Sequence, residues 1–361
     1  MQIGHISTFP PTRCGIATYA QDLIDNLPNV ESRKFRLCHH HDGDDGFQHQ
    51  ATMSSSLEFE SLAHAVNASS AGVIDLQHEF GIWGGDDGEH LVTFLEHCRT
   101  PIVATLHTTH GRNQTQVELL KLLCRKSERL VVLTDIGRNA IRSLVPECDE
   151  RLVVIRHGIP DVPYVEPAGG DVVRFISPGF FRPDKGLETI IVAFSILRES
   201  GMDFVYRIVG VPQLQFQGQR EYHDRIVAMI TANGLQKCVN VVGTFLEREE
   251  MIRHIQWSDC GVIGYTDLNH SSSGIIPLIL ACGRPVISTP IEYSRATASI
   301  VSGLFLTSRI TVDAMAETIR YVIAHRDYVK KLMPAIYNDT RKWNWRRAAE
   351  QYLAAFREAS A

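Results

Sequence analysis

The chain has 361 residues, enough for about two domains that each bury a hydrophobic core. Hydrophobic residues make up 44% of it and charged residues 21%, a composition that excludes disordered, collagen-like and coiled-coil proteins. The formal net charge of −5 excludes an overall attraction to nucleic acid or to anionic lipid.

Several features favour a cytoplasmic location. No uninterrupted apolar run reaches the roughly 18 residues that a membrane span needs, so we expect no transmembrane segment. Residues 1–5 lack the basic region of a signal peptide. The eight cysteines form no C-x-x-C pair and indicate reduced thiols. Peripheral attachment at the inner face of the membrane stays open.

In the first half of the chain, short strands alternate with helical patterns. The strands are rich in Val, Ile and Leu, as in a parallel sheet covered by helices on both faces. We expect strands at 2–7, 34–39, 72–77, 102–106, 130–134 and 152–155. We expect helices near 15–27, 56–68, 87–98, 114–126 and 136–145.

Turn and linker residues at 158–163 and 166–171 interrupt this alternation, which then restarts. Strands are expected at 172–177, 204–209, 239–242, 261–265, 285–288 and 304–307. A helix beginning near Leu187 carries a buried stripe that continues through Ile190, Ile191, Phe194 and Leu197. The sequence therefore predicts two doubly wound α/β domains, 1–165 and 166–340, followed by an aromatic-rich helix at 341–361.

Chemistry is expected in the loops that follow the strands, because open α/β sheets bind ligands at the carboxyl ends of their strands. Gly15, where the first loop becomes a helix, would let backbone N–H groups approach a phosphate or sugar, or is only a turn. His107 ends a buried strand and is either a functional or a hydrogen-bonded structural histidine. The glycine-rich loop 78–88, with Glu79 and an exposed Trp83, is either an acceptor platform or a mobile surface loop.

The second half offers an anion site in two loops. Arg182 and Lys185 precede a helix, where two cations and free N–H groups would bind a diphosphate; the alternative is solvated surface charge. Ser272, Ser273 and Gly274 would add backbone and hydroxyl donors at another helix start.

Two histidine patterns raise the question of a metal. The spacing of His107 and His110 lacks the i, i+4 arrangement and nearby acid of a helical metal site. The run 39–45, with three histidines and three aspartates, is better explained as a solvated loop. We therefore expect no metal site and no cofactor.

Together these loops resemble a known family. The Gly15 loop, His107, the motif Gly-x-x-Arg-Pro-Asp-Lys-Gly at 179–186 and the segment Ser-Gly-helix-Ala-Cys-Gly-Arg-Pro-Val-Ile-Ser-Thr-Pro at 273–290 resemble retaining glycosyltransferases of the GT-B fold, family 4. The resemblance covers nearly the whole chain, and its closing motif is the most specific part. Residues 77–88 are similar to a subgroup of that family.

The resemblance implies two Rossmann-like, doubly wound domains facing a cleft. A nucleotide-sugar donor, GDP- or UDP-hexose, would be held mainly by the second domain, and the terminal helix would cross back to the first. The implied donor-binding residues are Gly15, Gly179, Lys185, His270, Ser272, Ser273 and Gly274. The implied catalytic residues are His107, Lys185 and Arg182, and the implied acceptor-binding residues are Glu79, Trp83 and His110.

Two positions depart from the family pattern. Members commonly carry Glu-x7-Glu before the Ala-Cys-Gly motif, and the corresponding residues here are His270 and Leu278. The common arginine after the strand-end glycine is Phe180, with Arg182 two residues later.

The implied activity is transfer of a hexosyl group, mannose or glucose, to a saccharide or other hydroxyl acceptor in polysaccharide biosynthesis. Transfer would occur with retention and without metal, because Lys185, Arg182 and the helix N-termini would stabilise the departing diphosphate. Two alternatives remain: a catalytically silent sugar- or nucleotide-binding protein of the same fold, and a sugar-nucleotide epimerase-like enzyme.

Overall fold

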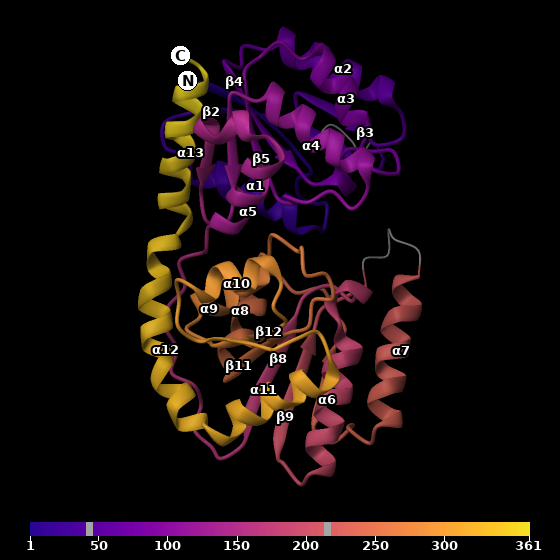
Figure 1. The fold of residues 1–361 in the computed structure, drawn as a ribbon, viewed down its shortest axis with the longest axis vertical. Coiled ribbons are helices and arrows are strands. Elements are labelled where there is room, and N and C mark those ends of the chain that lie inside the picture. The colour runs from indigo at the N-terminus through magenta and orange to yellow at the C-terminus, as the bar shows by residue number, and fades with distance from the viewer. Residues whose placement is uncertain (41–45, 213–217) are drawn as a thin grey trace. The chain divides into compact units, whose positions relative to one another are not determined.

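The structure is a computed structural model that describes residues 1–40, 46–212 and 218–361 (Figure 1). The chain forms two compact units. The first combines Met1–Gly158 with Trp343–Ala361, and the second comprises Ile159–Lys342. The expected boundaries at 165/166 and 340/341 lie close to these divisions. Residues 159–165 join the second unit because their backbone carbonyls accept hydrogen bonds from its side chains, for example Val162 O from the Tyr337 hydroxyl at 2.7 Å.

The first unit is built on a seven-stranded parallel sheet in the order β3-β2-β1-β4-β5-β6-β7. Its strands are β1 (Gln2–Ser7), β2 (Glu31–Cys38), β3 (His49–Thr52), β4 (Val73–His78), β5 (Ile102–Leu106), β6 (Arg129–Val132) and β7 (Leu152–Val154). Its helices are α1 (Gly15–Asn26), α2 (Ser56–Ala68), α3 (His90–His97), α4 (Gln114–Lys126), α5 (Asp135–Leu144) and α13 (Trp345–Ala359).

Different helices cover the two faces of this sheet. Alternate strand residues such as Ile74, Leu76 and Ala104 pack in one core with α2, α3, α4 and α5. The intervening residues Val73 and Val103 pack in a second core with α1 and α13. The terminal helix, yellow in Figure 1, is therefore part of the first unit's own core.

The second unit contains a six-stranded parallel sheet in the order β10-β9-β8-β11-β12-β13. Its strands are β8 (Val173–Pro178), β9 (Phe204–Val209), β10 (Val239–Val242), β11 (Cys260–Ile263), β12 (Val286–Ser288) and β13 (Leu304–Leu306). Its helices are α6 (Leu187–Glu199), α7 (Gln219–Ala232), α8 (Arg248–Trp257), α9 (Ile275–Ala281), α10 (Glu292–Ala298), α11 (Val312–Ala324) and α12 (Arg326–Thr340).

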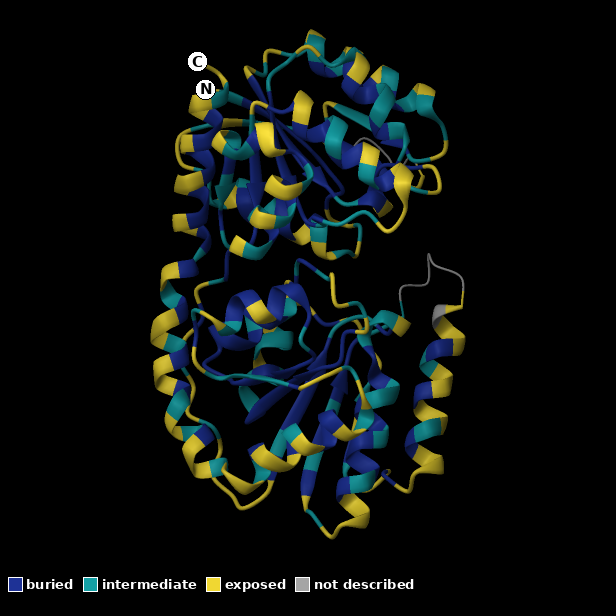
Figure 2. Ribbon diagram, in the orientation of Figure 1, coloured by how far each residue is buried: buried dark blue, intermediate teal, exposed yellow. Residues whose placement is uncertain are grey.

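Here too the central strands are buried from both sides (Figure 2). Cys260 and Val262 of β11 belong to a core shared with α6, α7 and α11. Gly261 faces the other way, where a Cβ atom would lie 2.8 Å from the Ile279 side chain of α9. Because side chains alternate along a strand, α9 covers the opposite face of the sheet. These findings confirm the expected pair of doubly wound α/β domains.

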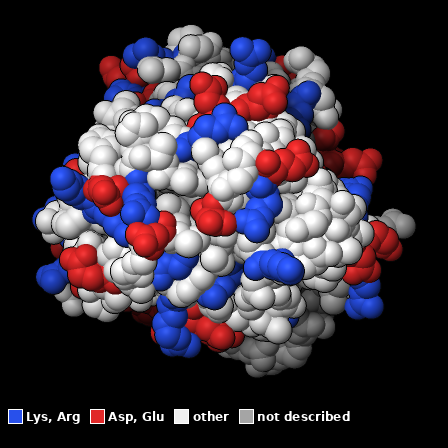
Figure 3. Space-filling model, turned by 90° about the horizontal axis from the view of Figure 1, so that it is seen from below, with Lys and Arg blue, Asp and Glu red and all other residues white. Residues whose placement is uncertain are grey.

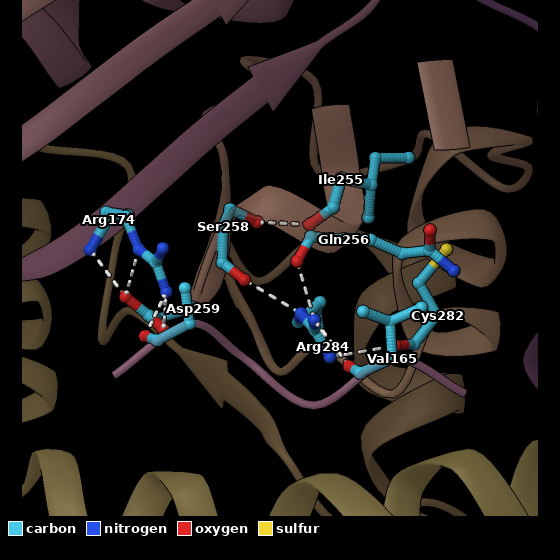
Figure 4. Close-up of polar contacts among 9 residues, drawn as sticks. Val165, Arg174, Ile255, Gln256, Ser258, Asp259, Cys282 and Arg284 are labelled. Atoms are coloured by element: carbon cyan, nitrogen blue, oxygen red, sulfur yellow. Dashed lines mark hydrogen bonds and ion pairs between the residues drawn. The ribbon is translucent and has the colours of Figure 1, made fainter. Parts of the chain in front are cut away.

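A buried arginine ties the end of the linker to this unit (Figure 4). Arg284 Nε donates to Ser258 O at 2.7 Å and Nη1 donates to Cys282 O at 3.1 Å. Nη2 donates to Gln256 O at 2.6 Å and to Val165 O at 2.8 Å. Burial lowers the pKa of this guanidinium. Arg284 of the 273–290 motif therefore has a structural role. Carbonyls at the carboxyl ends of α8 and α9 stabilise its charge.

Two further properties of the chain bear on the sequence-based expectations. No helix among the described residues is long and apolar enough to cross a bilayer, and all eight cysteines are free. Basic and acidic side chains are interspersed on the face shown in Figure 3.

Candidate functional site

The second unit brings two loops together at the centre of its sheet. β8 and β11 are neighbours where the strand order reverses, the position at which open α/β sheets form a ligand crevice. A Cβ atom on Gly186, whose φ is +60°, would lie 2.0 Å from the Gly264 carbonyl oxygen. Only a glycine allows this contact between the loop after β8 and the chain leaving β11.

Lys185 lies in a small group of charges on the first of these loops. Its Nζ is 3.7 Å from Asp184 Oδ2 and lies 4.4 Å from the centroid of the Tyr265 ring. Arg182 Nε donates to Asp184 Oδ1 at 2.8 Å. Burial by itself raises the pKa of Asp184, but the charges of Lys185 and Arg182 outweigh it and hold the pKa below its usual value. Two cations therefore surround one ionised carboxylate, which leaves an excess of positive charge for an anion.

Tyr265 connects this group to the second loop. Its hydroxyl lies 3.4 Å from Lys185 Nζ and 3.1 Å from Ser273 Oγ. Its ring stacks on the His270 imidazole with centroids 4.3 Å apart. Burial and the nearby Lys185 charge lower the pKa of His270 to about 4, so this ring is neutral at physiological pH. A neutral imidazole and a phenol adjoin the lysine, and both can form hydrogen bonds.

The other predicted donor-binding residues of this unit surround the cluster. Gly179, Lys185 and Tyr265 line one small pocket. Ser273 Oγ accepts the backbone N–H of Ile276 at 3.3 Å, so this hydroxyl already caps the first turn of α9. Ser272 is half-buried and Gly274 is exposed just before that helix.

The departures from the family pattern lie nearby in sequence. Phe180 lines the same pocket as Gly179 and Lys185. Leu278, on α9, is half-buried and carries no hydrogen-bonding group.

In the first unit, His107 lies directly after β5 and is buried. Its Nε2 is 2.8 Å from Gln77 Oε1, and its ring packs edge-on against Tyr19 with centroids 4.8 Å apart. Burial, with smaller contributions from His157 and His78, lowers the pKa of His107 to about 3. His107 is therefore a neutral imidazole at physiological pH.

The remaining predicted residues of this unit do not form one group. Glu79 is half-buried and accepts a short hydrogen bond from the Thr108 hydroxyl, next to His107 in the chain. His110 is half-buried three residues beyond His107, and Gly15 is exposed at the first position of α1.

The expectation of an exposed Trp83 was wrong. Trp83 is completely buried, its Nε1 donates to Gln77 O at 3.1 Å, and its ring packs against Phe59 and Phe94. The short 3-10 turn at Phe80–Ile82 directs the indole into the core of the sheet, where it cannot bind an acceptor. Trp83 therefore belongs to the hydrophobic core and forms no acceptor platform.

The described residues were also compared with the requirements of a metal site. Within the described ranges, no group of three or more histidine, cysteine, aspartate or glutamate side chains could hold a metal ion. Residues 41–45 of the histidine- and aspartate-rich run lie outside those ranges.

Three residues of these groups were missed in the sequence. Tyr265 follows β11 by two positions and Asp184 lies inside the 179–186 motif, so both stood in segments already singled out. Gln77 is one of three polar residues, with Asp75 and His78, in the completely buried strand β4. Such a side chain must find a partner when it is buried, and this requirement was the available signal.

Comparison with known proteins gives a family match for the second unit. Residues 165–342 match the family described as Glycosyl transferases group 1, which covers nearly the whole second unit and the loops described above. The chain is a glycosyltransferase. The sequence has no match among curated proteins.

The glycosyltransferase has the GT-B fold, as solved structures of low sequence identity show. Sucrose-phosphate synthase from Thermosynechococcus elongatus superposes with a TM-score of 0.81 at 15% identity, over 99% of this chain and 98% of that one. HepE from Anabaena, solved in complex with UDP, gives 0.76 at 15% identity over 98% and 99%. A trehalose-6-phosphate protein from E. coli bound with UDP-2-fluoro glucose gives 0.72 at 11% identity over 99% of each chain.

Proposed function

We propose that the glycosyltransferase transfers a hexosyl group, glucose or mannose, from a UDP- or GDP-sugar to a hydroxyl of a saccharide acceptor. Transfer proceeds with retention of configuration, as the resemblance to family 4 implies, and requires no metal. The similar HepE structures contain UDP, UDP and glucose, or UDP-glucose, which supports a nucleotide-sugar donor. The free cysteines favour a cytoplasmic location.

The observation that carries this proposal is the group around Lys185. Lys185 Nζ, the Tyr265 hydroxyl and Ser273 Oγ follow one another at 3.4 Å and 3.1 Å at the carboxyl edge of β8 and β11. The ammonium group neutralises charge, and the hydroxyls and backbone N–H groups donate hydrogen bonds. This is the chemistry that a diphosphate requires, and it would stabilise the departing nucleotide as its negative charge develops.

His107 is proposed to contact a substrate hydroxyl. As a neutral ring it forms hydrogen bonds without carrying charge into a buried position. Glu79 and His110 remain the proposed acceptor-binding residues, and Gly15 and Gly179 the positions of close backbone approach. Lys185 and Arg182 take the place of a divalent cation.

One observation favours a second function, a nucleotide-sugar binder without turnover. Leu278 occupies the position at which the resembled family commonly has its second glutamate, and its side chain cannot accept a hydrogen bond from a ribose. A site lacking that contact could hold a donor without orienting it for transfer.

A thermal-shift screen followed by a hydrolysis assay distinguishes these functions. The protein is melted with UDP, GDP, ADP and their glucose and mannose conjugates, because a ligand bound only by the folded state raises the melting temperature. We expect a shift with a UDP- or GDP-sugar and slow release of the nucleotide by transfer to water. Binding without any release supports the silent binder, and no shift with any nucleotide contradicts both functions.

A further inference from the structure

A continuous set of polar side chains lies on the face of the first sheet that α1 and α13 cover. His5 of β1 is paired with Asp75 of β4 in the strand register, and Gln77 of β4 is paired with Thr105 of β5. All four side chains are completely buried. They occupy alternate strand positions with Val73 and Val103, so they share one face with those apolar residues. His107 follows at the carboxyl edge of the same row.

Hydrogen bonds join these residues in sequence. His5 Nδ1 is 2.8 Å from Asp75 Oδ2, and Gln77 Nε2 donates to Asp75 Oδ1 at 2.7 Å. Gln77 Nε2 also lies 3.4 Å from the Thr105 hydroxyl, and Gln77 Oε1 is 2.8 Å from His107 Nε2.

The hydrogen bonds of the Gln77 amide determine how it lies between Asp75 and His107. Gln77 Nε2 donates to Asp75 Oδ1, so the amide nitrogen of Gln77 faces Asp75. The carbonyl oxygen of Gln77 therefore faces His107. Because a carbonyl can only accept, the proton of the neutral His107 ring resides on Nε2, and the lone pair resides on Nδ1.

We propose that Gln77, oriented by Asp75 and His5, is a positioning residue that holds His107 as its Nε2-protonated tautomer. The effect on transfer rests on the proposed function, but the tautomer itself does not. His107 Nε2 keeps its proton and donates a hydrogen bond to Gln77 Oε1.

The groups around His107 favour the uncharged form of its ring. Titratable groups near His107 include Tyr19 of α1, whose ring packs edge-on against it, and His157 and His78, whose charges would lower its pKa. Tyr352 of α13 reaches the row through Thr105, with 2.9 Å between the two hydroxyl oxygens. Gln77 is interposed between His107 and Asp75, so the Asp75 carboxylate contacts the Gln77 amide.

The test is nitrogen-15 NMR of the whole chain with labelled histidine, in which the two ring nitrogens report which one carries the proton. His107 is assigned by the resonances that disappear in His107→Gln. We expect Nε2 protonation in the wild-type chain, unchanged from pH 8 to pH 6. A wild-type ring protonated on Nδ1 overturns the proposal.

Two substitutions of Gln77 provide the second readout. Gln77→Leu removes the acceptor, so we expect His107 to lose its single tautomer and transfer to slow by about 10²-fold, the scale of a misplaced reacting group. Gln77→Glu places a carboxylate against Nε2, so the ring should take up a second proton near neutral pH and activity should fall on the acid side. The matched control is Gln114→Glu, at an exposed glutamine whose Nε2 donates to Glu118 Oε1 at 2.8 Å.

The outcomes separate this inference from the proposed function. In one outcome, wild-type His107 is protonated on Nε2 and its nitrogen-15 signals change in Gln77→Leu, but the wild-type chain transfers sugar from no donor. This outcome would contradict the proposed function and leave the tautomer assignment standing. Unchanged His107 signals in Gln77→Leu, or full activity together with a wild-type pH profile in Gln77→Glu, would overturn the positioning role.

Discussion

At Lys185, one ammonium group lies near both a carboxylate and an aromatic ring, and it supplies the charge of the proposed donor site. We predict that Lys185→Ala weakens binding of the nucleotide-sugar by about 10- to 150-fold, because one charged hydrogen bond contributes about 1.5–3 kcal/mol. Calorimetric titration with the donor found in the screen measures the change.

The matched control is Lys237→Ala, at an exposed lysine outside this cluster. It should bind the donor as the wild type does, and both variants should keep the wild-type melting temperature within a few degrees. Equal donor affinity in Lys185→Ala and the wild type would remove Lys185 from the proposed site.

A second prediction at this scale concerns His107. His107→Ala should lower turnover by about 10²-fold, the scale of a lost transition-state hydrogen bond, with a melting temperature within a few degrees of the wild type. Steady-state kinetics beside a thermal melt measure both quantities. His110→Ala is the comparison. If turnover falls only in that variant, or if His107→Ala unfolds, His107 is structural and His110 becomes the candidate.

Individual residues were the part of the site that the sequence predicted least well. The motif 179–186 located Lys185, because cations before a helix have a recognisable pattern. Trp83 could not be placed, because its exposure depends on a 3-10 turn that directs the ring into a core contributed by α2 and α3. Tyr265 and Gln77 have their roles through contacts with residues distant in the sequence, and no spacing rule encodes those contacts.

At the scale of elements, Arg284 of the 273–290 motif connects α8, α9 and the linker, and its contribution to stability can be measured. Arg284→Lys keeps the charge but replaces a planar fork by a single ammonium group, which cannot reach four carbonyls. We expect the free energy of unfolding of the second unit to fall by about 3 kcal/mol, because buried carbonyls lose their donors. Urea titration followed by hydrogen exchange in α8 and α9 measures it.

Arg320→Lys, at an exposed position of α11, is the control and should leave the unfolding free energy within about 0.5 kcal/mol of the wild type. A similarly small change in Arg284→Lys would mean that the carbonyls of α8 and α9 find other donors.

Element bounds followed well from periodicity wherever a strand or helix is buried on a regular pattern. The strands Gln2–Ser7 and Ile102–Leu106 and the helices Ser56–Ala68 and Gln114–Lys126 end where they were predicted to end. The short edge strand His49–Thr52 was not anticipated, because its four residues carry little apolar pattern and it forms by pairing with β2.

At the scale of the whole molecule, three neutral histidines, two buried and one half-buried, predict a dependence of stability on pH. The pKa values of His78 and His107 are lowered to about 3 and that of His270 to about 4, from an ordinary value of 6.5, with burial as the first cause in each case. Below pH 6.5 the unfolded chain binds protons that the folded chain does not, so stability is present above that pH and is lost as the pH falls toward 4.

Between pH 7.5 and pH 5.5 we expect a loss of about 1.4 kcal/mol for each of these histidines. Two of them lie in the first unit and one in the second, so hydrogen exchange in β4 and β5 should accelerate more than in β8 and β11. His78→Asn should reduce the dependence in the first unit alone. Equal exchange rates at the two pH values in both units would contradict the lowered pKa values.

A final prediction concerns metal. Transfer should continue at its normal rate in EDTA, because Lys185, Arg182 and backbone N–H groups are proposed to neutralise the diphosphate. The measurement is the initial rate with chelator, then with magnesium or manganese restored. Complete loss in chelator with recovery on adding the metal would show that a cation is required.

The place of α13 in the first unit has a consequence for synthesis on the ribosome. Tyr19, Val103 and Val131 are covered by Tyr352, Phe356 and their neighbours, which are translated only after all of residues 159–342. At roughly 5–20 residues per second, the apolar face that α13 covers waits about 10–40 s for its partner. The second unit can fold as soon as it emerges, whereas the first unit, although its translation starts earlier, is completed last.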